Sequence, residues 1–306
     1  MAQNGRSSLT RYAFLSIFAA VTTISMKSIA YWLTGSVGLL SDALESIVNL
    51  VAAAFTMVML VVAARPPDED HRYGHDKVEY FSSALEGVLI LVAAVSIAAA
   101  AITRLLNPQP LEQIGLGLAV TLAASVVNLI VARVLLRAGK RANSIALEAD
   151  GQHLMTDVWT SVAVVIGVAL VGPTGWPWLD PVVALAASAH IASTAIRLIR
   201  RSALGLMDTA LDLEQQRTLD EALQPFRNEG VQFHALRTRQ SGGRSFVSFH
   251  VLVPGVWTVS AGHLMLERIE AAVRQHIANV TVFTHLEPLE DPAAFDDIGL
   301  HRESAA

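Results

Sequence analysis

The chain has 306 residues, of which 53% are hydrophobic and only 16% are charged, and its formal net charge is −5. Soluble domains carry about 25% charged residues, so this composition argues against an ordinary soluble protein, and so mild a charge gives no argument for nucleic-acid binding. Because cysteine is absent, disulfides and thiolate metal sites are excluded, and any metal must be held by histidine, carboxylate or amide groups.

Six apolar segments are each long enough to cross a bilayer, which requires about 20 residues. They cover residues 10–34, 37–64, 78–105, 115–138, 143–172 and 178–203. Turn-forming stretches such as LTGSVG, NPQP and GPTGWP separate several of them. We therefore expect a membrane all-α domain, a bundle of six transmembrane helices, over residues 1–207.

The loops between these segments differ in charge. One set is rich in basic residues, whereas the opposite set holds almost only Arg104. Short loops rich in lysine and arginine stay in the cytoplasm, which predicts a multi-pass protein of the cytoplasmic (inner) membrane with both termini inside. The basic set comprises Arg6, Arg11, Arg65, Arg72, Lys77, Arg137, Lys140, Arg141, Arg197, Arg200 and Arg201.

The composition changes after residue 207. Residues 214–226 and 258–277 have the pattern of amphipathic helices, and FHALRTRQ, RSFVSFHVLVP and VTVFTHLEP have the pattern of strands. The order helix, strand, strand, helix, strand predicts a small soluble α+β domain over residues 208–291. Residues 292–306 are predicted to be a flexible tail.

Two of the apolar segments carry ionisable or amide side chains at helical spacing. Glu45 and Asn49 share one helix face, and His153 and Asp157 share another. A charge facing lipid at the bilayer centre costs roughly 2.5–3.5 kcal/mol, so these groups should face each other or water. A divalent metal site explains them, and a polar helix contact or a proton relay remains an alternative. Two further acids lie one turn towards one end of these helices: Asp42 and Asp150.

The loop RPPDEDHRYGHDKVE contains a second group of metal-ligand types. Asp68, His71 and His75 have the spacing D-x-x-H-x-x-x-H, so a loop that folds back can bring them to one ion. The alternative is a solvated polar loop.

The soluble domain contains a third group. His234, His250 and His285 lie on three different predicted strands, and Glu287 alternates onto the same strand face as His285. His263 lies in the second predicted helix. A lone strand histidine is usually a polar surface residue, but this density in one small domain favours a metal site.

Together these residues are similar to the cation diffusion facilitator family of metal/proton antiporters. The resemblance covers about residues 10–291, and its most specific parts are HLMTD, DEDHRYGHDK and HALRTRQSGGRSFVSFH. It implies six transmembrane helices, a cytoplasmic metallochaperone-like (ferredoxin-like) domain and a homodimer formed through that domain. It also implies three metal sites: Glu45, Asn49, His153 and Asp157 for transport; Asp68, His71 and His75 in the loop; and His234, His250, His263, His285 and Glu287 at the cytoplasmic dimer interface.

One departure from the family's pattern bears on metal choice. Zinc and iron exporters of the family carry two aspartates where this chain has Glu45 and Asn49. Histidine nitrogen at His153 favours Zn²⁺ over the harder Mn²⁺, while Fe²⁺, Cd²⁺ and Co²⁺ stay open.

The sequence therefore predicts an efflux transporter that exchanges Zn²⁺ for protons by alternating access. The alternatives are a membrane-anchored metal sensor and a manganese-selective member of the same family. An intramembrane metalloprotease would use a motif such as H-E-x-x-H, which does not occur in the chain, so we do not expect an enzyme.

Overall fold

The computed structural model describes residues 9–34, 37–107, 116–176 and 178–296. Within these ranges the structure describes only the backbone of residues 34, 37–45, 48, 116–118, 164, 168–169 and 172–173. The chain divides into two compact units, residues 1–204 and 205–306.

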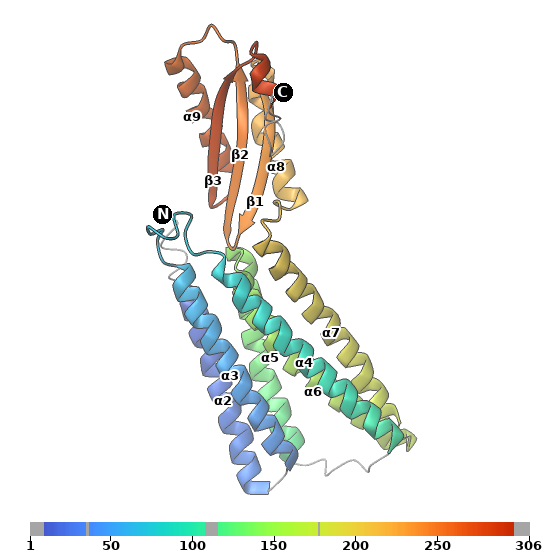
Figure 1. The fold of residues 1–306 in the computed structure, drawn as a ribbon. Coiled ribbons are helices and arrows are strands. Elements are labelled where there is room, and N and C mark those ends of the chain that lie inside the picture. The colour runs from blue at the N-terminus through green and yellow to red at the C-terminus, as the bar shows by residue number, and fades with distance from the viewer. Residues whose placement is uncertain (1–8, 35–36, 108–115, 177, 297–306) are drawn as a thin grey trace. The chain divides into compact units, whose positions relative to one another are not determined.

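In the described part of the first unit there are six long helices (Figure 1). They are α2 (Thr10–Thr34), α3 (Val37–Ala63), α4 (Val78–Leu106), α5 (Leu116–Ala142), α6 (Ile145–Thr174) and α7 (Leu179–Leu206). Among the described residues, four spans are long and apolar enough to cross a membrane: Thr10–Leu33, Val78–Leu106, Ala119–Ala142 and Leu179–Leu206. The predicted helical membrane domain is confirmed.

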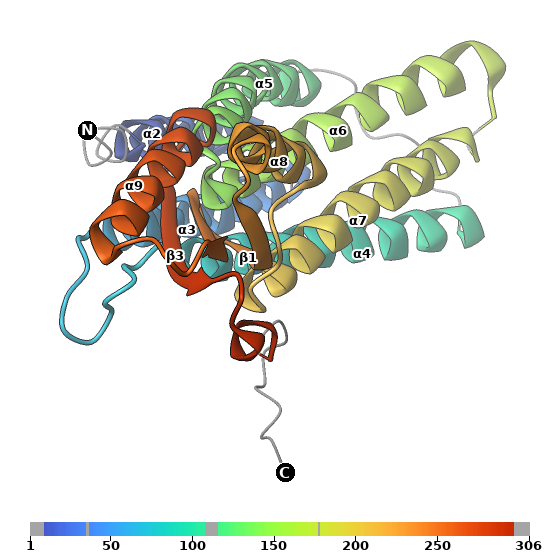
Figure 2. The ribbon, with the colours of Figure 1, turned by 90° about the horizontal axis from the view of Figure 1, so that it is seen from above.

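Small side chains let neighbouring helices approach closely, as is common in membrane bundles. A Cβ at Gly151 on α6 would lie 2.9 Å from Leu136 Cγ and 3.2 Å from its backbone nitrogen on α5, so a larger residue would push these helices apart or move the leucine. Helices α4 and α7 run side by side (Figure 2), and the hydroxyl of Ser202 lies 2.9 Å from that of Ser83.

The second unit contains α8 (Leu213–Asn228), β1 (Gln232–Ser241), β2 (Arg244–Val253), α9 (Val259–His276) and β3 (Val280–Pro288). The predicted order of two helices and three strands, and with it the α+β class, is confirmed. The sheet order is β1-β2-β3; β1 and β2 are antiparallel, and β2 and β3 are parallel. A tight turn at Gly242, whose φ is +54°, joins β1 to β2.

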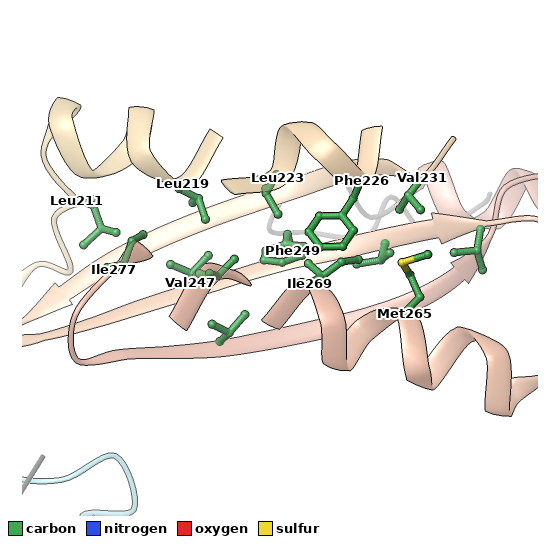
Figure 3. Packing of buried hydrophobic residues seen from close by; sticks show 14 residues of the cluster. Leu211, Leu219, Leu223, Phe226, Val231, Val247, Phe249, Met265, Ile269 and Ile277 are labelled. Atoms are coloured by element: carbon green, nitrogen blue, oxygen red, sulfur yellow. The ribbon is translucent and has the colours of Figure 1, made fainter. Parts of the chain in front are cut away.

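The core of this unit lies between the sheet and its two helices (Figure 3). Leu219 and Leu223 from α8 and Ile269 from α9 meet Val247 and Phe249 of β2 there. Because strand side chains alternate between faces, the residues of β2 next to these core positions point to the opposite face of the sheet.

The segment predicted to be a flexible tail begins with structure. Residues Pro292–Phe295 form a 3₁₀ turn, in which the side chain of Asp291 accepts a hydrogen bond from the backbone of Ala293 at 3.0 Å. The Phe295 ring lies 5.7 Å, centroid to centroid, from the ring of His234. An aspartate cap and an aromatic contact thus accompany this turn, and the flexibility of residues 292–306 stays a prediction. Residues 297–306 lie outside the described part of the chain.

Candidate functional site

Three polar side chains predicted to share a site meet between α3 and α6. The amide nitrogen of Asn49 donates to Asp157 Oδ2 at 2.8 Å, and Asn49 Oδ1 lies 2.6 Å from His153 Nε2. A carboxylate only accepts hydrogen bonds, so the Asp157 contact fixes which amide atom faces the histidine. Asn49 and His153 are buried.

Two further residues complete this cluster. Glu86 of α4 places Oε2 3.0 Å from His153 Nδ1, and Asn128 of α5 donates its amide nitrogen to Asp157 Oδ2 at 2.9 Å. Both are buried, with 1% and 4% of their surface exposed. The sequence carried a signal for each, a polar residue in an apolar helix, but offered no means of finding its neighbours.

The imidazole of His153 lies between two oxygen acceptors, one from Asn49 and one from Glu86. A neutral imidazole has only one N–H to donate. Acceptors near both nitrogens therefore suit a ring that carries a proton on each. A cation bound at Nε2 has to replace one of those protons.

A cavity of about 390 Å³ opens onto this cluster. Its polar part is formed by Asn49, Ser96, His153, Thr156 and Asp157, and apolar residues of α4 such as Ile90 and Ala93 form the rest. Its volume accommodates an ion together with several water molecules, each of which takes about 30 Å³ in the liquid.

The start of α6 is fixed to α4, and this positions the histidine two turns further on. Ser144 caps the helix by accepting from the backbone of Leu147, and its hydroxyl donates to the buried carboxylate of Glu79 at 2.5 Å. Serine at an N-cap satisfies one of the free N–H groups at a helix start. The ring of His153 thereby keeps its place against α4.

Three further acids were predicted near this site: Asp42 and Glu45 on α3, and Asp150 on α6. Asp150 accepts a hydrogen bond from Ser16 of α2 at 2.9 Å and is buried. Its carboxylate interacts electrostatically with Glu86 and His153 of the cluster. The side chains of Asp42 and Glu45 are outside the described residues, so the role predicted for Glu45 stays a prediction.

The loop before α4 brings Asp68, His71 and His75 together. Their ligand atoms lie within 4.8 Å of one another. Asp68 Oδ1 is 2.7 Å from the backbone nitrogen and 3.1 Å from the Nδ1 of His71, and Asp68 Oδ2 is 3.2 Å from His75 Nε2. The backbone N–H of His71 is the main reason that the pKa of the Asp68 carboxyl lies below its ordinary value.

A row of histidines crosses the sheet of the second unit. His234, His250 and His285 are register partners on β1, β2 and β3. They point away from α8 and α9, because Val251, next to His250, belongs to the core.

The carboxylate of Glu287 lies among these histidines. Its Oε2 is 2.7 Å from His234 Nε2, and its Oε1 is 3.3 Å from His250 Nδ1 and 3.5 Å from His285 Nε2. The ligand atoms of His234, His250 and Glu287 lie within 4.8 Å of one another.

The two other predicted members of this site are placed differently. The side chain of His285 is 66% exposed and borders the group. His263 is exposed on α9, which packs against the opposite face of the sheet, and it is not part of the group.

Comparison with known proteins covers nearly the whole chain. Residues 13–207 match the cation efflux transmembrane domain, and residues 211–289 match the cation efflux protein cytoplasmic domain. An uncharacterized transporter of Synechocystis is 54% identical over 93% of this chain and 92% of its own length. The cation-efflux pump FieF of Shewanella oneidensis is 30% identical over 90% and 92%, and that of Citrobacter koseri is 28% identical over 92% and 93%.

Proposed function

Because this chain belongs to the cation efflux family, we propose that it exports Zn²⁺ from the cytoplasm in exchange for protons. The observation that carries the proposal is the buried contact of Asn49, His153 and Asp157 at the edge of a cavity. Glu45, one turn before Asn49 on α3, is the proposed fourth ligand. Nitrogen and oxygen ligands in a set of four suit tetrahedral Zn²⁺.

Protons and metal compete for the same atoms. Zinc requires a free nitrogen lone pair on His153 and an ionised Asp157, so binding the metal releases protons. An acceptor oxygen lies near each nitrogen of the His153 ring, and this arrangement suits the proton-loaded form. Alternating access then lets protons displace zinc on the outer side and lets zinc displace protons on the cytoplasmic side.

The two other clusters are proposed to bind zinc without transporting it. The loop site of Asp68, His71 and His75 and the sheet site around Glu287 each offer histidine and carboxylate atoms within 4.8 Å of one another. We further propose that the chain resides in the inner membrane with both termini in the cytoplasm. It forms a homodimer through its second unit, where a second copy is proposed to supply His263 to the sheet site.

Two rival functions predict different behaviour. A membrane-anchored sensor has no use for the ligand contacts between α3 and α6, and a manganese-selective carrier is disfavoured by a histidine ligand. Fe²⁺, Cd²⁺ and Co²⁺ remain compatible with the residues of the site.

Transport into sealed proteoliposomes tests the proposal. The full chain is reconstituted with a zinc-sensitive dye inside and a pH gradient imposed across the membrane, and Zn²⁺, Cd²⁺, Fe²⁺, Co²⁺ and Mn²⁺ are compared. We expect zinc uptake that rises with an outward proton gradient and collapses when a protonophore is added. Zinc binding without uptake would favour the sensor, and fastest uptake of Mn²⁺ would favour the manganese carrier.

A further inference from the structure

Glu86 is a buried acid to which neither the family's transport site nor the helix pattern assigns a role. It lies in the middle of α4 with 1% of its surface exposed. An acidic side chain inside a membrane domain costs several kcal/mol unless it is paired or used. Such a residue therefore calls for a specific explanation.

The two carboxylate oxygens of Glu86 have separate surroundings. Oε1 accepts from the hydroxyl of Thr56 on α3 at 3.1 Å, and Thr56 lies 2.9 Å from the hydroxyl of Ser82. This anchors one side of the group. Oε2 is thereby left facing the ring of His153, 3.0 Å from Nδ1.

That placement puts a carboxylate on the side of the imidazole away from Asn49. A metal-bound histidine commonly donates its second N–H to a carboxylate, which fixes the ring orientation and the tautomer and makes the ring a better ligand. Glu86 Oε2 and His153 Nδ1 lie 3.0 Å apart as an ion pair, without the geometry of a hydrogen bond. A carboxylate at this position favours a proton on Nδ1, which leaves the lone pair of Nε2 to face Asn49 and Asp157, where the ion is proposed to bind.

The negative charge of Glu86 supports the same role. Asn49 contributes no charge to its contact with His153 and Asp157, so Asp157 is the only carboxylate among these three described side chains. Glu86 lies on a different helix but touches the same histidine. A divalent ion held in a low-dielectric interior requires compensating charge nearby. Glu86 thus supplies a second carboxylate to the cluster, on the side of the His153 ring away from Asn49.

We propose that Glu86 is a positioning residue of the transport site: it orients His153 and restores the negative charge that Asn49 does not provide. This inference rests on the proposed zinc transport. In this arrangement Asn49 contacts the ion and Glu86 compensates its charge, whereas an aspartate at position 49 would do both.

The test is a charge exchange in the full chain, measured as zinc uptake by proteoliposomes over a range of zinc concentrations. Glu86→Gln keeps the shape and the Thr56 contact but removes the charge. We expect KM to rise about 10–100-fold, the usual effect of losing a carboxylate behind a metal-bound histidine. Asn49→Asp added to Glu86→Gln returns the charge to the site, and we expect KM to recover to within a few-fold of wild type.

The controls separate charge from folding. Glu148→Gln removes a carboxylate that pairs with Arg201 at 2.6 Å, away from the cluster, and should leave KM unchanged. Recovery in the double variant also shows that Glu86→Gln folds.

Two results overturn the proposal: a Glu86→Gln variant with wild-type KM, or a double variant no better than Glu86→Gln. Absence of zinc uptake by the wild-type chain is a different result, because it contradicts the proposed function itself.

Discussion

Replacing Asp157 by alanine tests the transport site most directly. Asp157 Oδ2 accepts hydrogen bonds from the amides of Asn49 at 2.8 Å and Asn128 at 2.9 Å. Losing this acceptor costs about 1–3 kcal/mol for each buried donor that is left without it. The stability of the membrane domain should therefore fall by a few kcal/mol.

The substitution should lower the free energy of zinc binding by more than this, because Asp157 contributes a charged ligand. Removing one partner of a buried charged contact costs about 3–5 kcal/mol, and each 1.4 kcal/mol is a factor of about ten in affinity. We therefore expect zinc affinity at this site to fall by at least about 100-fold and uptake to vanish at concentrations that saturate the wild type. The isolated second unit, residues 208–291, should bind zinc as before.

The assay joins zinc flux of the full chain in proteoliposomes to zinc calorimetry on residues 208–291. Asp157→Asn removes the charge but keeps one acceptor oxygen, so it should lose flux while destabilising the protein less than Asp157→Ala. Asp180→Asn is the matched control, because Asp180 pairs with Arg104 at 3.0 Å and takes no part in the cluster. Wild-type flux in Asp157→Ala would refute the assigned role.

Substitutions at three further positions, Asn49, Glu287 and His285, test other predicted ligands. Asn49→Asp should keep transport but make it more dependent on pH, because it adds a titrating carboxylate; if Asn49→Asp and Asn49→Ala both retain the wild-type zinc affinity and pH profile, Asn49 is not a ligand. Glu287→Gln should weaken zinc binding by residues 208–291 about 30-fold, since a hydrogen bond or contact to a charge contributes about 2 kcal/mol. Glu290→Gln is its control: that carboxylate accepts from the backbone of Gly255 at 2.8 Å, and calorimetry should find no change. His285→Ala should weaken zinc binding less than Glu287→Gln, because His285 is 66% exposed, and should lower dimer stability while slow transport remains. Unchanged zinc affinity in His285→Ala would remove His285 from the sheet site.

Helical periodicity reports which residues of one helix share a face, so it could indicate which polar side chains of α3 and α6 lie on the same side of their helix. Asn49, His153 and Asp157 do meet. Periodicity says nothing of what lies across from that face, so the contacts of Glu86 and Asn128 could not be predicted from their own helices. A polar residue in an apolar helix indicates only that some partner exists.

The sequence also predicted only part of the sheet site. Alternation along β3 placed His285 and Glu287 on one face, but the alignment of His234 with His250 depends on strand register. The pairing of β1 with β2 shifts between His234 and Arg237, where Ala235 has φ +48°. The shift at Ala235 has no clear sequence signature, whereas the turn between β1 and β2 is marked by glycine.

The three helices around His153 explain how one ion can influence the packing of the membrane domain. The ring belongs to α6, one of its nitrogens faces Asn49 of α3, and the other faces Glu86 of α4. A ligand shifts a conformational equilibrium only by the difference in its affinity for the two states. An ion at Nε2 replaces the direct contact between His153 and Asn49, which joins α6 to α3. It leaves the contact between His153 and Glu86, which joins α6 to α4, in place. Exchange of metal for protons therefore changes the α3–α6 packing more than the α4–α6 packing. We therefore expect movement during transport to occur chiefly where α3 meets α6, while α4 and α6 stay joined through Glu86 and the Glu79–Ser144 cap.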